Sequence, residues 1–226
     1  MKIVTNCYYS NYNETLLRYL IEFLDNMCGG NVRLALDFVR VFIDSGHVDT
    51  EKIISIFHDS GNYLVPLHEF LRAVTYVDHE YYSPQASVIL NLFDISTTEG
   101  KEHFLSPTLL SQMERWAQKS DSDGYVHVAE IYAYLQTLGY MPSQINWSIG
   151  RLLYRNLLET AVKQKAADNK MNHSESDKPS YYRITTVGAY YVKRLVTRFT
   201  YLDAIIIDTP LLNSDFRNKI GNEFSI

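Results

Sequence analysis

The side chains best suited to chemistry are scattered along this chain of 226 residues. None of its seven histidines belongs to an H-E-x-x-H run or another paired metal-binding spacing. Asp78, His79 and Glu80 form a small polar cluster, which we interpret as a solvated loop. Asp121 and Asp123 resemble part of a calcium loop without its other ligands. The sequence also lacks a G-x-S-x-G elbow and a dinucleotide glycine fingerprint, so we expect no catalytic residue and no metal site.

Charge is unevenly distributed along the chain. Residues 1–104 carry 7 Lys and Arg against 14 Asp and Glu, a net charge of −7. Residues 105–205 carry 12 against 9, a net charge of +3, and residues 206–226 carry 2 against 3. A basic segment in an acidic chain suggests a local anionic partner, for which nucleic acid is the usual choice.

The composition suits one or two globular domains, since 46% of the residues are hydrophobic. Cys7 and Cys28 are the only cysteines, and without a C-x-x-C spacing they indicate free thiols in a reducing compartment. The N-terminal residues lack the apolar block of a signal peptide, and no apolar run reaches transmembrane length. We therefore expect a cytoplasmic protein with no membrane partner.

The first third of the sequence predicts helices. Apolar residues recur at helical spacing over residues 14–27, 32–45 and 65–76, and Gly29, Gly30 and Gly46 follow two of these stretches. A further helix is expected from Asp49 or Thr50, with Ile53, Ile54 and Phe57 facing inward. The aromatic segment that follows is interpreted as a packed connection, with a short strand or helix in the apolar run over residues 88–93.

A second group of elements is predicted after Gly100. The expected order is a helix over residues 107–117, an extended piece at Tyr125 and Val126, a helix ending at Gly139, and a helix from Pro142 to about Asn156. A strand over residues 157–162, a polar loop over 163–180 and a strand over 181–184 follow, and Thr185 or Thr186 caps a last helix. The β-branched run 204–207 predicts a strand or extended arm, and residues 213–226 a tail.

The two strands around the polar loop have the right length to pair as a hairpin over the preceding three helices. This order resembles the winged-helix fold, a variant of helix-turn-helix. The stretch QTLGYMPSQINWSIGRLLYRNLLE resembles its turn and second helix, and YYRITTVGAYYVKRL resembles the end of its wing, where Gly188 lets a helix start close to the sheet. We expect a mainly α protein: a helical bundle over residues 1–104, a winged-helix domain over 105–205, and an arm over 206–226.

If the winged helix binds DNA, the second helix of its turn motif enters the major groove. Ile145, Ile149, Leu152 and Leu153 would then face the core. The outer face would carry Ser143, Gln144, Trp147, Ser148, Arg151 and Arg155, with Gln144 and Asn146 placed to read bases. Further cations would follow the DNA backbone; they are Lys163, Lys165, Lys170, Lys178, Lys193, Arg194 and Arg198.

Other features of the same region favour a protein partner. Asp168, Glu175 and Asp177 partly cancel the lysines of the predicted wing, and the predicted recognition helix carries only two cations. An exposed Trp147 suits a protein contact at least as well as a DNA groove. Both kinds of partner, and self-assembly, therefore stay open.

The stretch GGNVRLALDFVRVF resembles the "G-N-x-R" start of the lid helix in AAA+ and STAND-type ATPases. In those families a helical lid is often followed by a winged helix, as in replication initiators and some bacterial defence ATPases. The resemblance implies that Arg33 points toward nucleotide phosphates. The chain contains no G-x-x-x-x-G-K-[ST] motif, so ATP would bind only with a motor domain that this chain lacks.

These patterns together predict a non-catalytic regulatory module of a larger ATPase. The module would couple the motor to a partner protein or to double-stranded DNA through the winged helix. The alternative is a free-standing winged-helix transcription regulator, which would require a symmetric dimer and a palindromic site.

Overall fold

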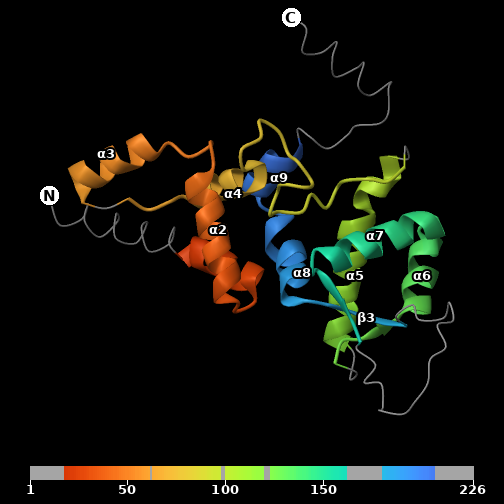
Figure 1. The fold of residues 1–226 in the computed structure, drawn as a ribbon. Coiled ribbons are helices and arrows are strands. Elements are labelled where there is room, and N and C mark those ends of the chain that lie inside the picture. Colours follow the sequence, from red (N-terminus) through yellow and green to blue (C-terminus); the bar gives the residue numbers. More distant parts are fainter. Residues whose placement is uncertain (1–17, 62, 98–99, 120–122, 162–179, 207–226) are drawn as a thin grey trace, which may run out of the picture. The chain divides into compact units, whose positions relative to one another are not determined.

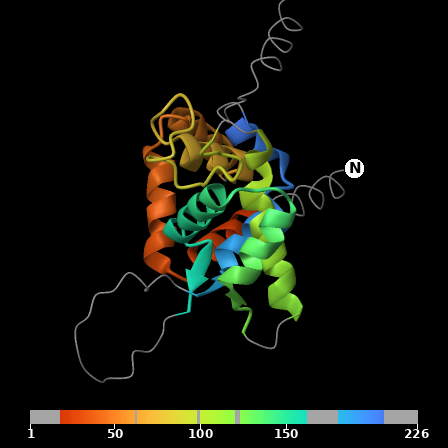
Figure 2. The same cartoon turned by 90° about the vertical axis from the view of Figure 1, so that its right-hand side faces the viewer.

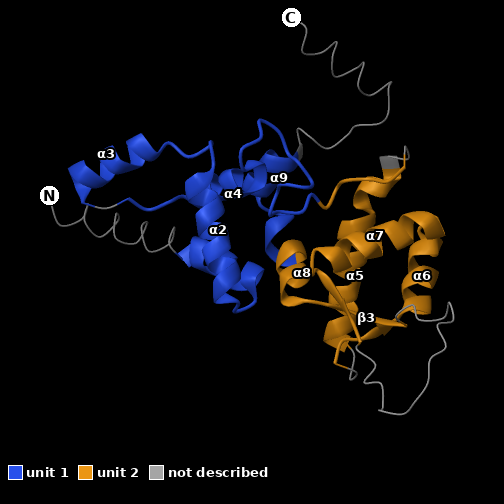
Figure 3. Ribbon diagram, in the orientation of Figure 1, with its two compact units in different colours: residues 1–91, 193–209 blue, residues 92–192, 210–226 orange. Residues whose placement is uncertain are grey.

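The computed structural model describes residues 18–61, 63–97, 100–119, 123–161 and 180–206. The chain is mainly α-helical with one small sheet (Figure 1). It forms two compact units, one of residues Met1–Asn91 and Lys193–Thr209, the other of Leu92–Val192 and Pro210–Ile226 (Figure 3). We call them unit 1 and unit 2.

Unit 1 is built from helices around a cluster of phenylalanines. A helical stretch over residues 18–28 precedes α2 (Val32–Asp44), α3 (Thr50–Ser60), α4 (Leu67–Tyr76) and, from the end of the chain, α9 (Phe199–Ile206). Phe23 lies edge-on to Phe38 and to Phe70, with ring centroids 5.8 and 5.7 Å apart. Phe42 stacks on Phe70 at 5.1 Å. Aromatic pairs at these separations stabilise a core beyond the area that they bury.

Side-chain caps explain where α2 and α3 begin. The Asn31 side chain accepts a hydrogen bond from the Leu34 N–H at 3.2 Å, and the Asp49 carboxylate accepts one from the Lys52 N–H at 2.9 Å. Each cap satisfies one N–H that has no partner within its helix. Both caps agree with the predicted helix starts.

Three predictions for unit 1 are wrong. Ile54 and Phe57 of α3 are 67% and 59% exposed, so α3 does not turn these side chains inward. The run over residues 88–93 is irregular rather than a strand or helix, and the Val88 N–H donates to the Val74 carbonyl at 3.1 Å. The β-branched run near residue 205 belongs to helix α9 instead of a strand or arm, because burial of Tyr201, Ala204 and Ile205 follows the helical period.

The first helical element of unit 2 is the short 3-10 helix η1 (Gly100–Phe104). The unit continues with α5 (Leu105–Lys119), β1 (Val126–His127), α6 (Val128–Thr137), α7 (Pro142–Tyr154), β2 (Leu158–Thr160), β3 (Tyr181–Ile184) and α8 (Thr186–Tyr190). A π-helical stretch, η2 (Tyr191–Leu195), continues directly from α8. The strands lie at one end of helices α5, α6 and α7 (Figure 2).

The three strands form one antiparallel sheet in the order β1-β3-β2. Leu158 pairs with Ile184 and Thr160 with Tyr182, so the predicted pairing of the two extended pieces is confirmed. The predicted polar loop over residues 163–180 lies almost wholly outside the described residues. On the other side of β3, Val126 of β1 pairs with Tyr182.

Helix α8 starts where it does because Gly188 permits a close approach. A Cβ at this position would lie 2.2 Å from the Leu157 carbonyl oxygen, much closer than any real contact. Thr185 caps the helix by accepting from the Gly188 N–H at 3.1 Å. The predicted reason for a glycine at this point, a helix lying against the sheet, is confirmed.

Candidate interaction surface on helix α7

Helix α7 has an inward face that is broader than the sequence predicts. Ile145, Ile149 and Leu152 are buried as expected, and Leu153 is half-buried. Gln144 and Ser148 are also buried, with 1% and 0% of their surfaces exposed. Their predicted place on the outer face is therefore wrong.

Hydrogen bonds, two of them to partners 47 and 42 residues away in the sequence, explain why these two polar residues are buried. The Gln144 Nε2 donates to the Thr97 hydroxyl at 3.0 Å, and its Oε1 accepts from the Met141 N–H at 2.8 Å. The hydroxyls of Ser148 and Ser106 lie 2.8 Å apart. Buried polar groups are tolerated when they are paired in this way.

A buried carboxylate anchors the segment before η1 against α7. Glu102 is 1% exposed and accepts hydrogen bonds from both the N–H and the hydroxyl of Ser96 and of Thr97. The Gln144 Nε2 lies 3.4 Å from the same carboxylate. Burial alone would raise the pKa of Glu102, but these hydrogen bonds outweigh it and lower that pKa. No spacing in the sequence identifies this cluster, because its members become neighbours only on folding.

Arg151, a predicted DNA contact, is held within unit 2. Its Nη1 donates to the Asp94 carbonyl oxygen at 3.1 Å and lies 3.6 Å from the Asp94 carboxylate. Its guanidinium also stacks 4.6 Å from the Trp147 ring centroid, and its side chain is only 15% exposed. An arginine used in this way has little capacity left for a phosphate or a base.

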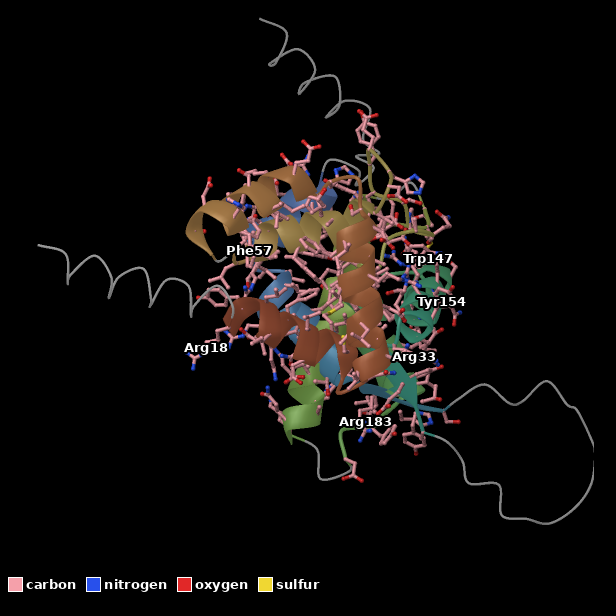
Figure 4. The ribbon with its side chains drawn as sticks, turned by 60° about the vertical axis from the view of Figure 1, so that its left-hand side comes forward. Arg18, Arg33, Phe57, Trp147, Tyr154 and Arg183 are labelled. Atoms are coloured by element: carbon pink, nitrogen blue, oxygen red, sulfur yellow. The ribbon has the colours of Figure 1, made fainter. Side chains whose placement is uncertain are left out.

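The outward face of α7 combines small and aromatic residues. Ser143, Asn146, Gly150 and Tyr154 are exposed at spacings of three or four residues, and Tyr154 is 82% exposed. Figure 4 shows Tyr154 and the half-buried Trp147 on this helix. Nothing lies within 4 Å of a Cβ built at Gly150, so the surface is open between the two aromatic side chains.

Two of the predicted DNA contacts outside α7 are also engaged. Arg194 and Arg198 lie 3.3 and 3.6 Å from the carboxylate of Glu22, within unit 1. Lys193 is exposed and Arg155 is half-buried, and the Arg155 guanidinium lies 5.8 Å from the Tyr154 ring centroid. The predicted wing lysines lie outside the described residues; they are Lys163, Lys165, Lys170 and Lys178.

Arg183 was not singled out by the sequence, yet it organises the sheet. Its Nε donates to Glu159 on the neighbouring strand at 2.6 Å, and its guanidinium lies 4.7 Å from the Tyr125 ring. The hydrogen bond to Glu159 raises the pKa of Arg183. Which residues are neighbours across two strands can be predicted only when the register of the strands is known.

Unit 1 contains a polar depression of about 310 Å³ that mixes acids, cations and histidines. The Tyr63 hydroxyl donates to Glu69 at 2.5 Å, and Asp49 is occupied by its capping bond. Burial, followed by the contact with Glu69, raises the pKa of Tyr63 to about 12. Across the described ranges, no group of three or more metal-binding side chains could hold an ion.

Among the described residues, no helix has both the length and the apolar character needed to cross a membrane. Comparisons with protein-family models, with curated proteins and with solved structures found no match for this chain.

Proposed function

We propose that this protein is a non-catalytic interaction module whose unit 2 is a winged-helix domain that binds a partner protein through α7. The order α5, β1, α6, α7, β2, β3 supports the winged-helix assignment. The sheet order β1-β3-β2 supports it further, since the last two strands form an antiparallel pair that follows the second helix of the turn motif. Fold alone does not decide between DNA and protein, so the surface residues must.

The observation that carries the proposal is the exposed aromatic face of α7 beside cations that are already paired. Tyr154 is 82% exposed, and α7 contains no acidic residue that would keep this face hydrated. Aromatic side chains dominate the energetic centres of protein interfaces. A DNA phosphate, in contrast, would have to compete with Asp94 for Arg151 and with Glu22 for Arg194.

DNA binding provides the first test. Fluorescence anisotropy of a labelled duplex would be measured with the full chain at about 50 and 200 mM salt, a range over which a protein making several phosphate contacts loses orders of magnitude in affinity. We expect no binding at either concentration. Salt-sensitive binding that weakens in Arg155→Ala, with folding unchanged, would overturn the protein-partner assignment and favour a DNA-binding regulator.

The test for a protein partner replaces Tyr154 with a photo-crosslinking amino acid, and the crosslinking is carried out in cells that express the protein. The captured protein would be purified, and its Kd for the full chain compared between wild type, Tyr154→Ala and the exposed control Glu130→Ala. We expect Tyr154→Ala to weaken binding at least tenfold, about 1.4 kcal/mol. Equal affinity of all three proteins contradicts the proposed surface.

The link to a larger P-loop ATPase is the second part of the proposal. It is supported by the resemblance of the GGNVR stretch, whose Arg33 is exposed at the start of α2 (Figure 4). The complex captured through Tyr154 would hydrolyse ATP, and Arg33→Ala would lower its rate. A captured complex without ATPase activity refutes this part while leaving the protein-binding surface of α7 intact.

A further inference from the structure

Helix α2 in unit 1 exposes a straight row of aliphatic side chains. Val32 is 71% exposed, Leu36 64%, Val39 37% and Ile43 59%. They follow one another at spacings of four, three and four residues, which place them along one line of a helix. We call these four residues the α2 row.

The fold of unit 1 does not need the α2 row, because another face of the same helix supplies the core. Phe38 and Phe42 are buried against Phe23 and Phe70. At 100° per residue, the α2 row lies roughly a quarter-turn or more away from these two phenylalanines. A helix with apolar residues on two separate faces has more apolar surface than a single core can bury. Single exposed aliphatics are ordinary, but an aligned row of them marks a contact surface.

A groove extends the α2 row at its N-terminal end. It has a volume of about 240 Å³ and lies between the helical stretch 18–28 and the start of α2. Ile21, Leu24, Val32 and Ala35 line it together with one acid, Asp25, and Ile21 is 56% exposed. The apolar surface therefore has width as well as length, as a bound helix requires.

On α2 itself, the two charges nearest to the α2 row have the same sign. Arg33 and Arg40 each directly follow a residue of the α2 row in the sequence. Around the helix axis they lie about 50° from the edge of the α2 row, which is closer to the row than Asp37 and Asp44 lie. Both arginines are exposed, and the contact of Arg40 with Asp37, at 3.7 Å, is between exposed side chains and weak. The opposite edge leads to Ala35 and the core. The rim of this surface is therefore basic along α2, and its other side is apolar apart from Asp25 in the groove.

We propose that the α2 row binds an amphipathic helix of another protein whose apolar stripe is flanked by carboxylates. A second copy of this chain fits less well. In an antiparallel pair of α2 helices, Arg33 would lie near the partner's Arg40, so like charges would meet. In a parallel pair, both arginines would lie opposite the apolar residues Ala35 and Phe42 of the second copy. Carboxylates on the incoming helix would instead meet both arginines, which gives selectivity beyond apolar burial.

The test uses the full chain and two synthetic, fluorescein-labelled helical peptides of about 20 residues, long enough to form helix. Both carry the same leucine stripe; one is flanked by glutamates, the other by lysines. We expect the glutamate peptide to bind at least tenfold more tightly, as measured by anisotropy. Leu36→Asp should weaken it at least tenfold. The matched control Ile54→Asp, on equally exposed α3, should leave its Kd unchanged.

The charge reversal Arg33→Glu with Arg40→Glu should invert the preference toward the lysine peptide. Circular dichroism melts would show that each variant remains folded. The proposal is overturned if neither peptide binds, if both bind equally, or if light scattering shows a dimer that Leu36→Asp dissociates. Tyr154→Ala should leave peptide binding unchanged, so this test stays separate from that of α7.

Discussion

The Arg151 guanidinium donates to the main-chain oxygen of Asp94 at 3.1 Å, across 57 residues of sequence. This contact ties the irregular segment before η1 to α7, and the same side chain also stacks on the Trp147 ring. Arg151 therefore acts first as a structural cross-link of unit 2. If Arg151→Ala were used to test nucleic-acid binding, a loss of binding could come from unfolding of unit 2 as well as from a lost contact with the nucleic acid.

Arg151→Ala is expected to destabilise the protein by about 1–3 kcal/mol, because it removes a charged donor from a largely buried carbonyl and carboxylate. Urea denaturation followed by circular dichroism would measure the change in the free energy of unfolding. The control Arg115→Ala, at an exposed position of α5, should cost no more than about 0.5 kcal/mol, as for ordinary surface substitutions. Similar losses in both variants would contradict the cross-link.

Gly188→Ala should be severely destabilising, by about 3 kcal/mol or more, because the new Cβ meets the Leu157 carbonyl oxygen at 2.2 Å. Gly150→Ala is the matched control, since its Cβ would enter open space within a helix. Alanine should stabilise α7 there by about 0.5–1 kcal/mol. Thermal melts of the two variants should thus shift in opposite directions, and a stable Gly188→Ala protein would contradict the close approach.

Glu102→Gln tests the buried carboxylate. At pH 7 we expect a loss of about 1–3 kcal/mol, since the amide NH₂ would face the N–H and hydroxyl donors of Ser96 and Thr97.

The lowered pKa of Glu102 predicts a pH dependence of stability. A folded-state pKa below the unfolded value of about 4.5 means that the ionised group stabilises the fold above that pH. This contribution is lost as the pH falls through the lowered folded pKa. Urea midpoints across this range should fall less steeply in Glu102→Gln than in wild type. The exposed control Glu130→Gln should follow wild type at both ends, and parallel curves for all three proteins would refute the assignment.

Tyr201→Phe should show that α9 is part of unit 1. The Tyr201 side chain is fully buried and its hydroxyl donates to the Leu90 carbonyl at 2.8 Å. Loss of this buried hydrogen bond should cost about 1 kcal/mol, as seen in chemical denaturation. Tyr154→Phe, which removes an exposed hydroxyl, serves as control and should have no measurable effect. An unchanged Tyr201→Phe protein would indicate that α9 detaches in solution.

The local features of the fold could be predicted because they are encoded locally. The start of α7 at Pro142, the cap at Asn31 and the two paired strands follow from periodicity, capping chemistry and breakers within a few residues. The need for a glycine at position 188 could be predicted for the same reason. A helix that begins within one residue of the end of a strand must pack closely against that strand's sheet.

The wrong predictions concern residues whose environment comes from far away in the sequence. Ile54 and Phe57 have the helical spacing of a core, but no element within the described part of the chain covers them. The run near Ile205 has β-branched residues, yet burial against unit 1 favours a helix there.

The sequence by itself determined the order of the elements and, outside the runs 88–93 and 204–207, which of them coil and which extend, because backbone geometry and side-chain periodicity act over a few residues. Only the tertiary structure decided which polar groups are available to a partner. The sequence predicts Gln144 and Arg151 as outward-facing contacts. In the structure they donate hydrogen bonds to Thr97 and Asp94, which belong to a distant segment of the chain. A hydrogen bond between distant residues depends on the path of the whole chain, which no short window of sequence contains.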